Sequence, residues 1–76
     1  MQELVKFLAQ SLVENPDKVV VTETEGPEAV IIELNVASED MGKVIGRQGR
    51  IAKEIRTIIK TVAQRTGEKV TVEIVD

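Results

Sequence analysis

At the middle of the chain stands Val44-Ile45-Gly46-Arg47-Gln48-Gly49-Arg50-Ile51, and this stretch decides how the 76 residues fold. Two glycines three positions apart interrupt apolar residues that recur at helical spacing. Glycine adopts positive φ angles without strain and allows another molecule's backbone to approach closely. The stretch therefore predicts that one helix ends, the chain turns tightly at the two glycines, and a second helix begins.

The side chains within this turn favour an anionic ligand. Arg47, Gln48 and Arg50 can all donate hydrogen bonds. The N–H groups that open the second helix point toward the same place, and a helix N-terminus attracts anions. We interpret the turn as a binding site for a sugar-phosphate backbone, with a plain helix–helix turn as the alternative.

The charges are divided along the chain, although the overall net charge is only −3. Residues 1–42 carry two basic and nine acidic side chains, a net charge of −7. Residues 43–65 carry seven basic side chains and one acidic one, a net charge of +6. This asymmetry indicates one face that meets a polyanion and another that avoids it. The alternative is a solvated helix that happens to be basic.

Composition excludes several classes of function. The chain has no cysteine and no histidine, so neither a thiolate metal site nor histidine-based catalysis is available, and we expect no cofactor and no enzymatic activity. No stretch approaches the ~20 apolar residues of a membrane span, so we expect no membrane contact and a cytoplasmic location. The length and the 42% hydrophobic content indicate a single domain over residues 1–76.

The hydrophobic periods predict an α+β fold in the order αββααβ. A helix is expected over residues 2–14, ended by Asn15-Pro16, and Gly26-Pro27 joins the next two segments as an antiparallel hairpin. Ser38 is expected to cap the short helix before the turn, and Gly67 to end the long one. The expected strands span residues 18–25, 28–36 and 68–75, and the long helix spans residues 50–65.

The helical spacing also assigns a core side to each helix. We expect Phe7, the sole aromatic residue, to be in the core. On the long helix, the apolar residues cover one arc and the basic residues nearly the opposite one. The apolar arc holds Ile51, Ile55, Ile58, Ile59 and Val62, and the basic arc holds Arg50, Lys53, Arg56 and Lys60.

The helix–Gly-x-x-Gly–helix unit between strands resembles the KH domain, whose loop clamps about four backbone nucleotides of a single strand. The element order is that of the type II KH fold, a three-stranded sheet with helices packed on one face. Ile51 stands one position earlier than the closing isoleucine of the commonest family pattern. The longer run from Met41 to Lys53, followed by Ile55-Arg56-Thr57, resembles the small bacterial KhpA-type family over essentially the whole chain.

The resemblance implies binding of single-stranded RNA with broad specificity, as an RNA chaperone or post-transcriptional regulator. It also implies a homodimer, or a heterodimer with a KhpB (Jag)-type KH protein, and effects on cell elongation and division. A protein-interaction module that scaffolds such a partner is the alternative function. Single-stranded DNA remains open as a ligand.

Each candidate site residue has an expected role. Gly46 and Gly49 allow close approach of the ligand backbone, whereas Arg50 and Lys53 contact phosphate. Arg56 and Lys60 are expected to act only by long-range attraction. Ile45 and Ile32 are candidates for the floor of a base-binding groove. The predicted RNA-binding residues are Lys43, Ile45, Gly46, Arg47, Gln48, Gly49, Arg50 and Lys53.

Overall fold

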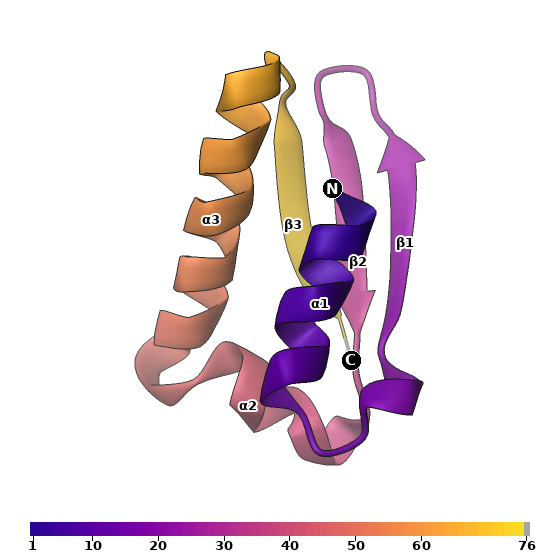
Figure 1. Cartoon of the computed structure of the whole chain (residues 1–76), viewed down its shortest axis with the longest axis vertical. Helices are drawn as coiled ribbons and strands as arrows, with labels where there is room; N and C mark the ends of the chain where they lie inside the picture. Colours follow the sequence, from indigo (N-terminus) through magenta and orange to yellow (C-terminus); the bar gives the residue numbers. More distant parts are fainter. Residues whose placement is uncertain (76) are drawn as a thin grey trace.

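The computed structural model describes residues 1–75, and its elements follow the predicted order (Figure 1). Short 3₁₀ turns link several of them, at Pro16–Lys18, Ser38–Asp40 and Arg47–Gly49. The helices are α1 (Gln2–Leu12), α2 (Met41–Ile45) and α3 (Arg50–Thr66), and the strands are β1 (Val20–Glu25), β2 (Val30–Asn35) and β3 (Val70–Val75).

The three strands form one mixed sheet in the order β1-β2-β3. β1 and β2 pair antiparallel, which confirms the predicted hairpin, and Gly26 N–H donates to the Ala29 carbonyl at 2.9 Å within its turn. β3 runs parallel to β2, because α2 and α3 carry the chain back across one face of the sheet. The fold therefore has the predicted α+β architecture in the order αββααβ, with its helices on one face of the sheet (Figure 1).

The core lies between this sheet and the helices. Ile32 and Leu34 of β2 are fully buried, as are Val5 and Ala9 of α1. Alternate residues of a strand point to opposite faces, so burial of these two β2 residues identifies the face that the helices cover. The remaining buried apolar residues are Val19, Val44, Ala52, Ile55, Ile59, Ala63 and Val72.

The prediction that Phe7 belongs to the core is wrong, because its side chain is 65% exposed. α1 packs through Val5 and Ala9, and Phe7 is two residues from each. Two residues along an α-helix correspond to a rotation of ~200°, so Phe7 points away from the sheet. The apolar arc of α3 is likewise wider than its buried stripe, since Ile58 and Val62 are exposed.

A buried carboxylate shortens α1 and replaces the expected cap of α2. The helix ends at Leu12 rather than residue 14, since the N–H groups of Glu14 and Asn15 donate to the Asp40 carboxylate at 3.2 and 3.1 Å. The prediction of Ser38 as N-cap is wrong. Ser38 begins a 3₁₀ turn, and Asp40 occupies the N-cap position of α2 with its side chain turned toward the end of α1 instead.

α3 ends as its sequence predicts. Gly67 has φ 76° and ψ 15°, the left-handed conformation that glycine adopts easily. Glu68 N–H donates to the Ala63 carbonyl at 2.9 Å, which closes the last turn of the helix. The chain then enters β3 directly, so α3 lies antiparallel to β3 (Figure 1).

Candidate nucleic-acid interface

The turn between α2 and α3 contains three residues with positive φ in sequence positions 46–49. Gly46 has φ 75° and ψ 176°, Gln48 has φ 58° and ψ 26°, and Gly49 has φ 73° and ψ 15°. A Cβ atom at Gly46 would lie 2.9 Å from Ile51 Cβ, whereas one at Gly49 would meet open space. Gly46 therefore allows the turn to pack against α3, and Gly49 leaves the outer side of the turn open.

The backbone of this turn presents free hydrogen-bond donors. Gly49 N–H donates to the Gly46 carbonyl at 3.2 Å, and Arg50 N–H donates to the Arg47 carbonyl. Within residues 1–75, the N–H groups of Arg47 and Gln48 find no backbone or side-chain acceptor. Two adjacent donors thus face solvent at the N-terminal end of α3, where the helix dipole favours negative charge.

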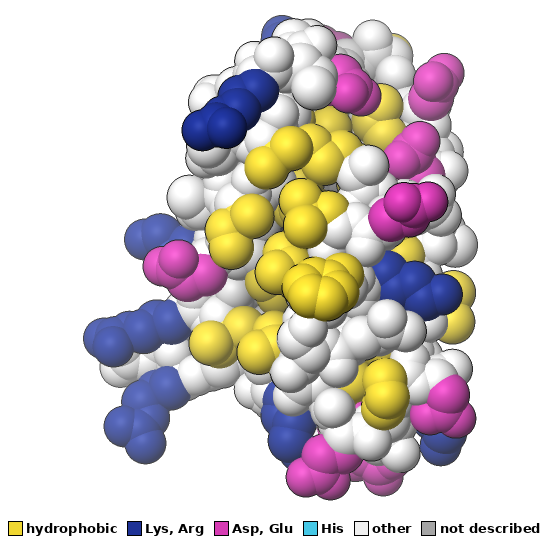
Figure 2. Space-filling view, in the orientation of Figure 1, with side chains coloured by type: hydrophobic (Ala, Val, Ile, Leu, Met, Phe, Trp, Pro, Cys, Tyr) yellow, Lys and Arg dark blue, Asp and Glu magenta, His cyan; other side chains and the backbone are white. Residues whose placement is uncertain are grey.

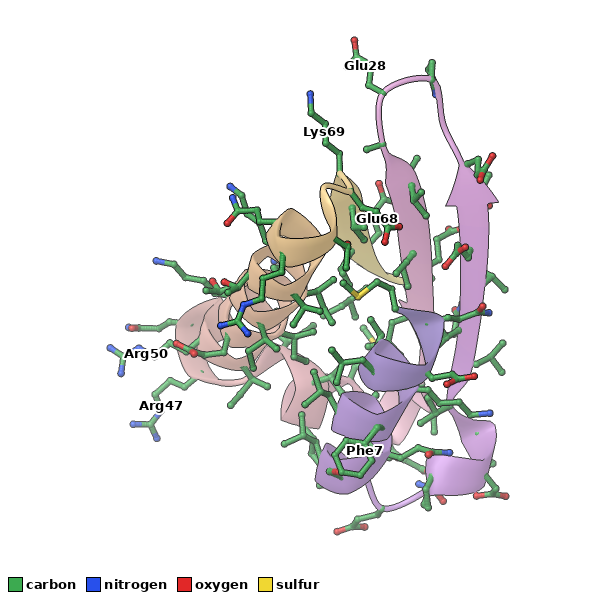
Figure 3. The ribbon with its side chains drawn as sticks, turned by 45° about the horizontal axis from the view of Figure 1, so that its top comes forward. Phe7, Glu28, Arg47, Arg50, Glu68 and Lys69 are labelled. Atoms are coloured by element: carbon green, nitrogen blue, oxygen red, sulfur yellow. The ribbon has the colours of Figure 1, made fainter. Side chains whose placement is uncertain are left out.

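Cationic side chains surround these donors. Arg47 and Arg50 extend from the turn away from the body of the molecule, as Figure 3 shows. The Arg50 guanidinium makes only a long contact of 3.5 Å with Gln48 Oε1. Lys53 is exposed about one turn further along α3. The structure therefore brings Arg47, Gln48, Arg50 and Lys53 together around the two glycines.

Lys43 differs from these residues, because acidic side chains hold it. Its Nζ atom lies 3.7 Å from Asp40 Oδ1 and 3.5 Å from Glu14 Oε1. Burial raises the pKa of Asp40, but hydrogen bonds from the Asn15 side chain and from two backbone N–H groups lower it, and the Lys43 charge adds to this. The net effect is a pKa below the ordinary value of 3.8. Lys43 thus neutralises a structural carboxylate.

The two proposed groove residues have different positions. Ile45 is 37% exposed and directly precedes Gly46, so it can contact a ligand. Ile32 is completely buried beneath the helices. The interpretation of Ile32 as part of the groove floor is therefore wrong, and its role is in the core.

A groove that the sequence analysis missed lies between α3 and the free edge of β3. Arg56 Nε donates to the Val72 carbonyl at 3.3 Å, which places this cation against the strand edge. Two adjoining hollows of about 310 and 450 Å³ follow this edge, and Lys60 lines both. They also share Val70 and Thr71 of β3. The spacing of Lys53, Arg56 and Lys60 was the available signal, but it did not tell which strand would lie beside it.

The surface separates the charges as the sequence predicts. In Figure 2 several basic side chains project on the α3 side of the molecule, whereas acidic ones outnumber basic ones on the β1 side. On the sheet face that no helix covers, Glu33 of β2 and Glu73 of β3 are register partners. A polyanion is thus repelled from the open sheet face and attracted to the turn and groove beside α3.

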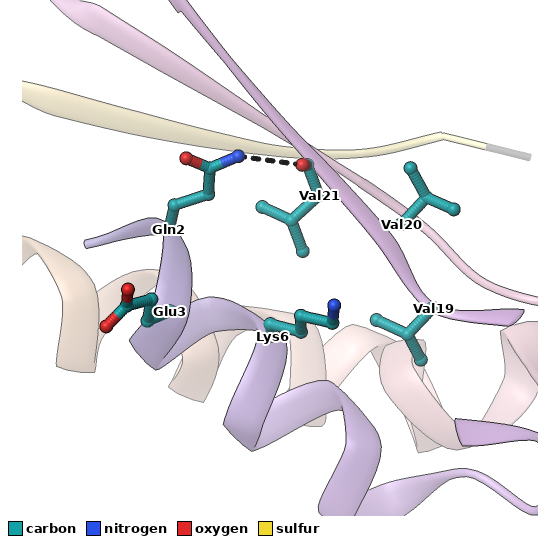
Figure 4. A pocket seen from close by; sticks show the side chains of 6 residues that line it. All are labelled: Gln2, Glu3, Lys6, Val19, Val20 and Val21. Atoms are coloured by element: carbon teal, nitrogen blue, oxygen red, sulfur yellow. Dashed lines mark hydrogen bonds between the residues drawn. The ribbon is translucent and has the colours of Figure 1, made fainter. Parts of the chain in front are cut away.

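Another hollow, of about 390 Å³, lies between α1 and β1 on the other side of the molecule (Figure 4). Gln2 Nε2 donates there to the Val21 carbonyl at 2.9 Å, which ties α1 to the strand. Glu3 and Lys6 give it mixed charge. Across residues 1–75, no three acidic, histidine or cysteine side chains are placed to hold a metal ion. No helix in that range is long and apolar enough to cross a membrane.

Comparisons with known proteins find matches over nearly the whole chain. A family profile described as "KhpA/KhpB, KH domain" matches residues 2–74. The chain is 57% identical over 75 residues to the RNA-binding protein KhpA of Caldanaerobacter subterraneus subsp. tengcongensis, covering 99% of this chain and 100% of that protein. It is 56% identical, with the same coverage, to the RNA-binding protein KhpA of Clostridium perfringens.

Solved structures show the same fold within a longer protein. A crystal structure of Aquifex aeolicus Era bound to GDP.AlF4- matches with a TM-score of 0.67 and 25% identity, over 96% of this chain and 28% of that one. Era in complex with MgGDPNP and nucleotides 1506–1542 of 16S ribosomal RNA matches with a TM-score of 0.61, at the same identity and coverage. From the profile and the full-length relatives, the chain belongs to the KhpA/KhpB family of KH domains, which is not a family of enzymes.

Proposed function

We propose that this protein binds single-stranded RNA, with the turn at residues 46–49 holding the sugar-phosphate backbone. The observation that carries the proposal is the pair of free N–H donors at Arg47 and Gln48. They lie where Gly46 and Gly49 keep side chains out of the way and where Arg50 adds positive charge. Backbone N–H groups recognise phosphate oxygens independently of base sequence.

The groove beside α3 would receive the nucleotides that follow. Arg56 and Lys60 line this groove, and Lys53 precedes Arg56 by three residues, on the same flank of α3 nearer the turn. A rise of 1.5 Å per residue makes the distance from residue 50 to residue 60 about 15 Å, enough for a short single strand. The relatives named RNA-binding proteins, and the Era structure that contains ribosomal RNA, support RNA as the class of ligand.

The affinity of one copy should be modest. Single-strand binders often gain ~1–3 kcal/mol per base from stacking on aromatic side chains. The only aromatic residue, Phe7, is on α1 rather than in the turn or the groove. Phosphate contacts and apolar packing against Ile45 must therefore supply the affinity, which we place in the micromolar class, with little preference for base sequence.

A double substitution in the turn tests this function. Arg47→Asp with Gln48→Asp should abolish binding to an unstructured oligoribonucleotide, measured by fluorescence anisotropy, because both side chains would repel phosphate. The two positions are exposed, so circular dichroism and urea unfolding should change little. Lys18→Asp with Thr24→Asp is the matched control, since it changes the charge equally at exposed positions around β1. Unchanged RNA affinity in the folded turn variant would refute the proposal.

The second candidate function is a scaffold for protein partners, and the exposed apolar side chains of α1 and α3 favour it. Pairing with a KhpB-type protein, a cytoplasmic location and a role in cell elongation follow from the family resemblance alone. A scaffold would keep its partner complex and its cellular role in the turn variant, whereas an RNA-binding protein would lose its cellular role.

A further inference from the structure

β3 is an outer strand of the sheet, so the edge that it turns toward the groove beside α3 has no neighbouring strand (Figure 1). On its other edge, the Lys69 carbonyl accepts a hydrogen bond of 2.9 Å from Val30 N–H of β2. The backbone groups of successive strand residues alternate between the two edges, so those of Thr71 also face β2. The N–H and C=O groups of Val70 and Val72 therefore point to the free edge, and both residues line the groove.

A free strand edge offers hydrogen-bond partners to nucleic-acid bases. Each residue that points there presents an N–H donor and a C=O acceptor. Adenine and cytosine carry an exocyclic amino group, which projects from the ring and donates well to a carbonyl. Uracil has no amino group, and its ring N–H stands between two carbonyl oxygens that an acceptor repels. An unoccupied carbonyl on this edge would thus favour adenine and cytosine over uracil.

In this protein, one acceptor of the edge is already occupied. Arg56 Nε of α3 donates to the Val72 carbonyl at 3.3 Å. Val72 is only 5% exposed, whereas the next residue toward the start of the strand, Thr71, is exposed. A guanidinium group has five N–H donors, no acceptor and a permanent positive charge. Arg56 therefore replaces an acceptor for base amino groups with a cation that attracts any phosphate.

We propose that Arg56 is a specificity-determining residue, which prevents the groove from distinguishing bases by their amino groups. This inference rests on the proposed binding of single-stranded RNA along the groove. Arg56 and Val72 line the hollow of about 310 Å³, which also contains Lys60. A strand that runs from the turn at residues 46–49 toward Lys60 would pass Val72, so a base in this hollow would meet the occupied carbonyl.

The alternative role for Arg56 is a structural connection between α3 and β3. Ile55 and Ile59 of α3 and Val72 of β3 already belong to the same buried core cluster, so the helix is held to the strand without it. The Arg56 side chain is exposed outside this cluster. A structural connection would affect the stability of the fold, whereas a specificity-determining residue would affect the ratio of affinities for different bases.

Two methionine substitutions separate these roles. Arg56→Met removes the donor and frees the Val72 carbonyl. Lys60→Met is the matched control, because it removes the same charge from the same groove and leaves the Arg56 contact with Val72 in place. Both positions are exposed, so circular dichroism and urea unfolding should show that both variants fold. Fluorescence anisotropy of the full chain then measures the affinity for octamers of adenylate, cytidylate and uridylate.

Both variants should bind all three octamers more weakly than the wild type does, because each loses one cation. In addition, Arg56→Met should raise the affinities for adenylate and cytidylate relative to uridylate by about two- to tenfold, the range for one neutral hydrogen bond. Lys60→Met should keep the wild-type ratios. Stacking within each free octamer is the same for every variant, so it cancels when the ratios are compared.

The outcomes distinguish this inference from the proposed function. If the wild type binds the octamers and Arg56→Met keeps the wild-type ratios, the inference is wrong and RNA binding stands. A loss of stability in Arg56→Met with unchanged ratios would assign the residue a structural role only. Equal changes of the ratios in Arg56→Met and Lys60→Met would attribute them to charge and also overturn the inference. A wild type that binds none of the three octamers would refute the proposed function and the inference together.

Discussion

Two glycines of the same motif have different physical roles in this protein. Gly46 is needed for packing, because Ile51 occupies the space where its Cβ would be. Gly49 is needed for conformation and for access, because its φ of 73° favours glycine and the space outside it is open. A sequence motif treats the two positions alike, whereas the structure separates stability from ligand approach.

Alanine substitutions should reveal this difference. Gly46→Ala combines overpacking with a backbone at φ 75° and ψ 176°, which essentially only glycine adopts, and should lower the free energy of unfolding by about 2–4 kcal/mol. Gly49→Ala has only the backbone strain and should lower it by about 1 kcal/mol. Urea unfolding of both variants at one pH measures the two values. Equal losses would mean that the contact with Ile51 relaxes without consequence.

At the scale of elements, the position of the turn at residues 46–49 depends on how α2 is attached to the rest of the fold. α2 has only five residues, Met41–Ile45, too few to be stable by itself. Asp40 at its start accepts hydrogen bonds from Glu14, Asn15 and the Asn15 side chain at the end of α1. One buried carboxylate therefore fixes both the end of the first helix and the start of the second.

This attachment should make stability depend on pH in a specific direction. The folded-state pKa of Asp40 lies below its ordinary value of 3.8, so the ionised carboxylate stabilises the fold above that value. The contribution is lost as the pH falls through the lower, folded-state pKa. The urea midpoint of the wild type should exceed that of Asp40→Asn at pH 6, and the gap should narrow toward pH 3. A difference between the two urea midpoints that does not change with pH would show that ionisation of Asp40 does not contribute to stability.

At the scale of the whole molecule, the features that could be predicted from the sequence are those set by residues close together in the chain. The order of elements, the hairpin at Gly26 and the glycine end of α3 all follow from neighbours in the chain. The surroundings of Phe7 and Arg56 depend on how distant elements pack. Periodicity shows that Phe7 is apolar on an amphipathic helix, but not that Val5 and Ala9 are the α1 residues that become fully buried. Similarly, Arg56 could not be assigned to a groove before β3 was placed beside it.

The division of charge also predicts how binding should respond to salt. The net charge of −3 is repulsive, yet Glu33 and Glu73 lie on the sheet face that the helices leave open, and salt screens exposed charges that are more than ~8 Å apart. If one domain neutralises about four phosphates of single-stranded RNA, log K should fall with log salt at a slope of roughly −3.

Lys60 lines the groove rather than the turn, so it tests how far the RNA extends along α3. Lys60→Gln should reduce the slope by about 0.7, whereas Lys18→Gln, outside the turn and groove, should leave it unchanged. Anisotropy titrations from 50 to 300 mM KCl, about a sixfold range, give all three slopes. If the slope for Lys60→Gln equals that of the wild type, the contacted phosphates lie only at the turn and the first part of α3.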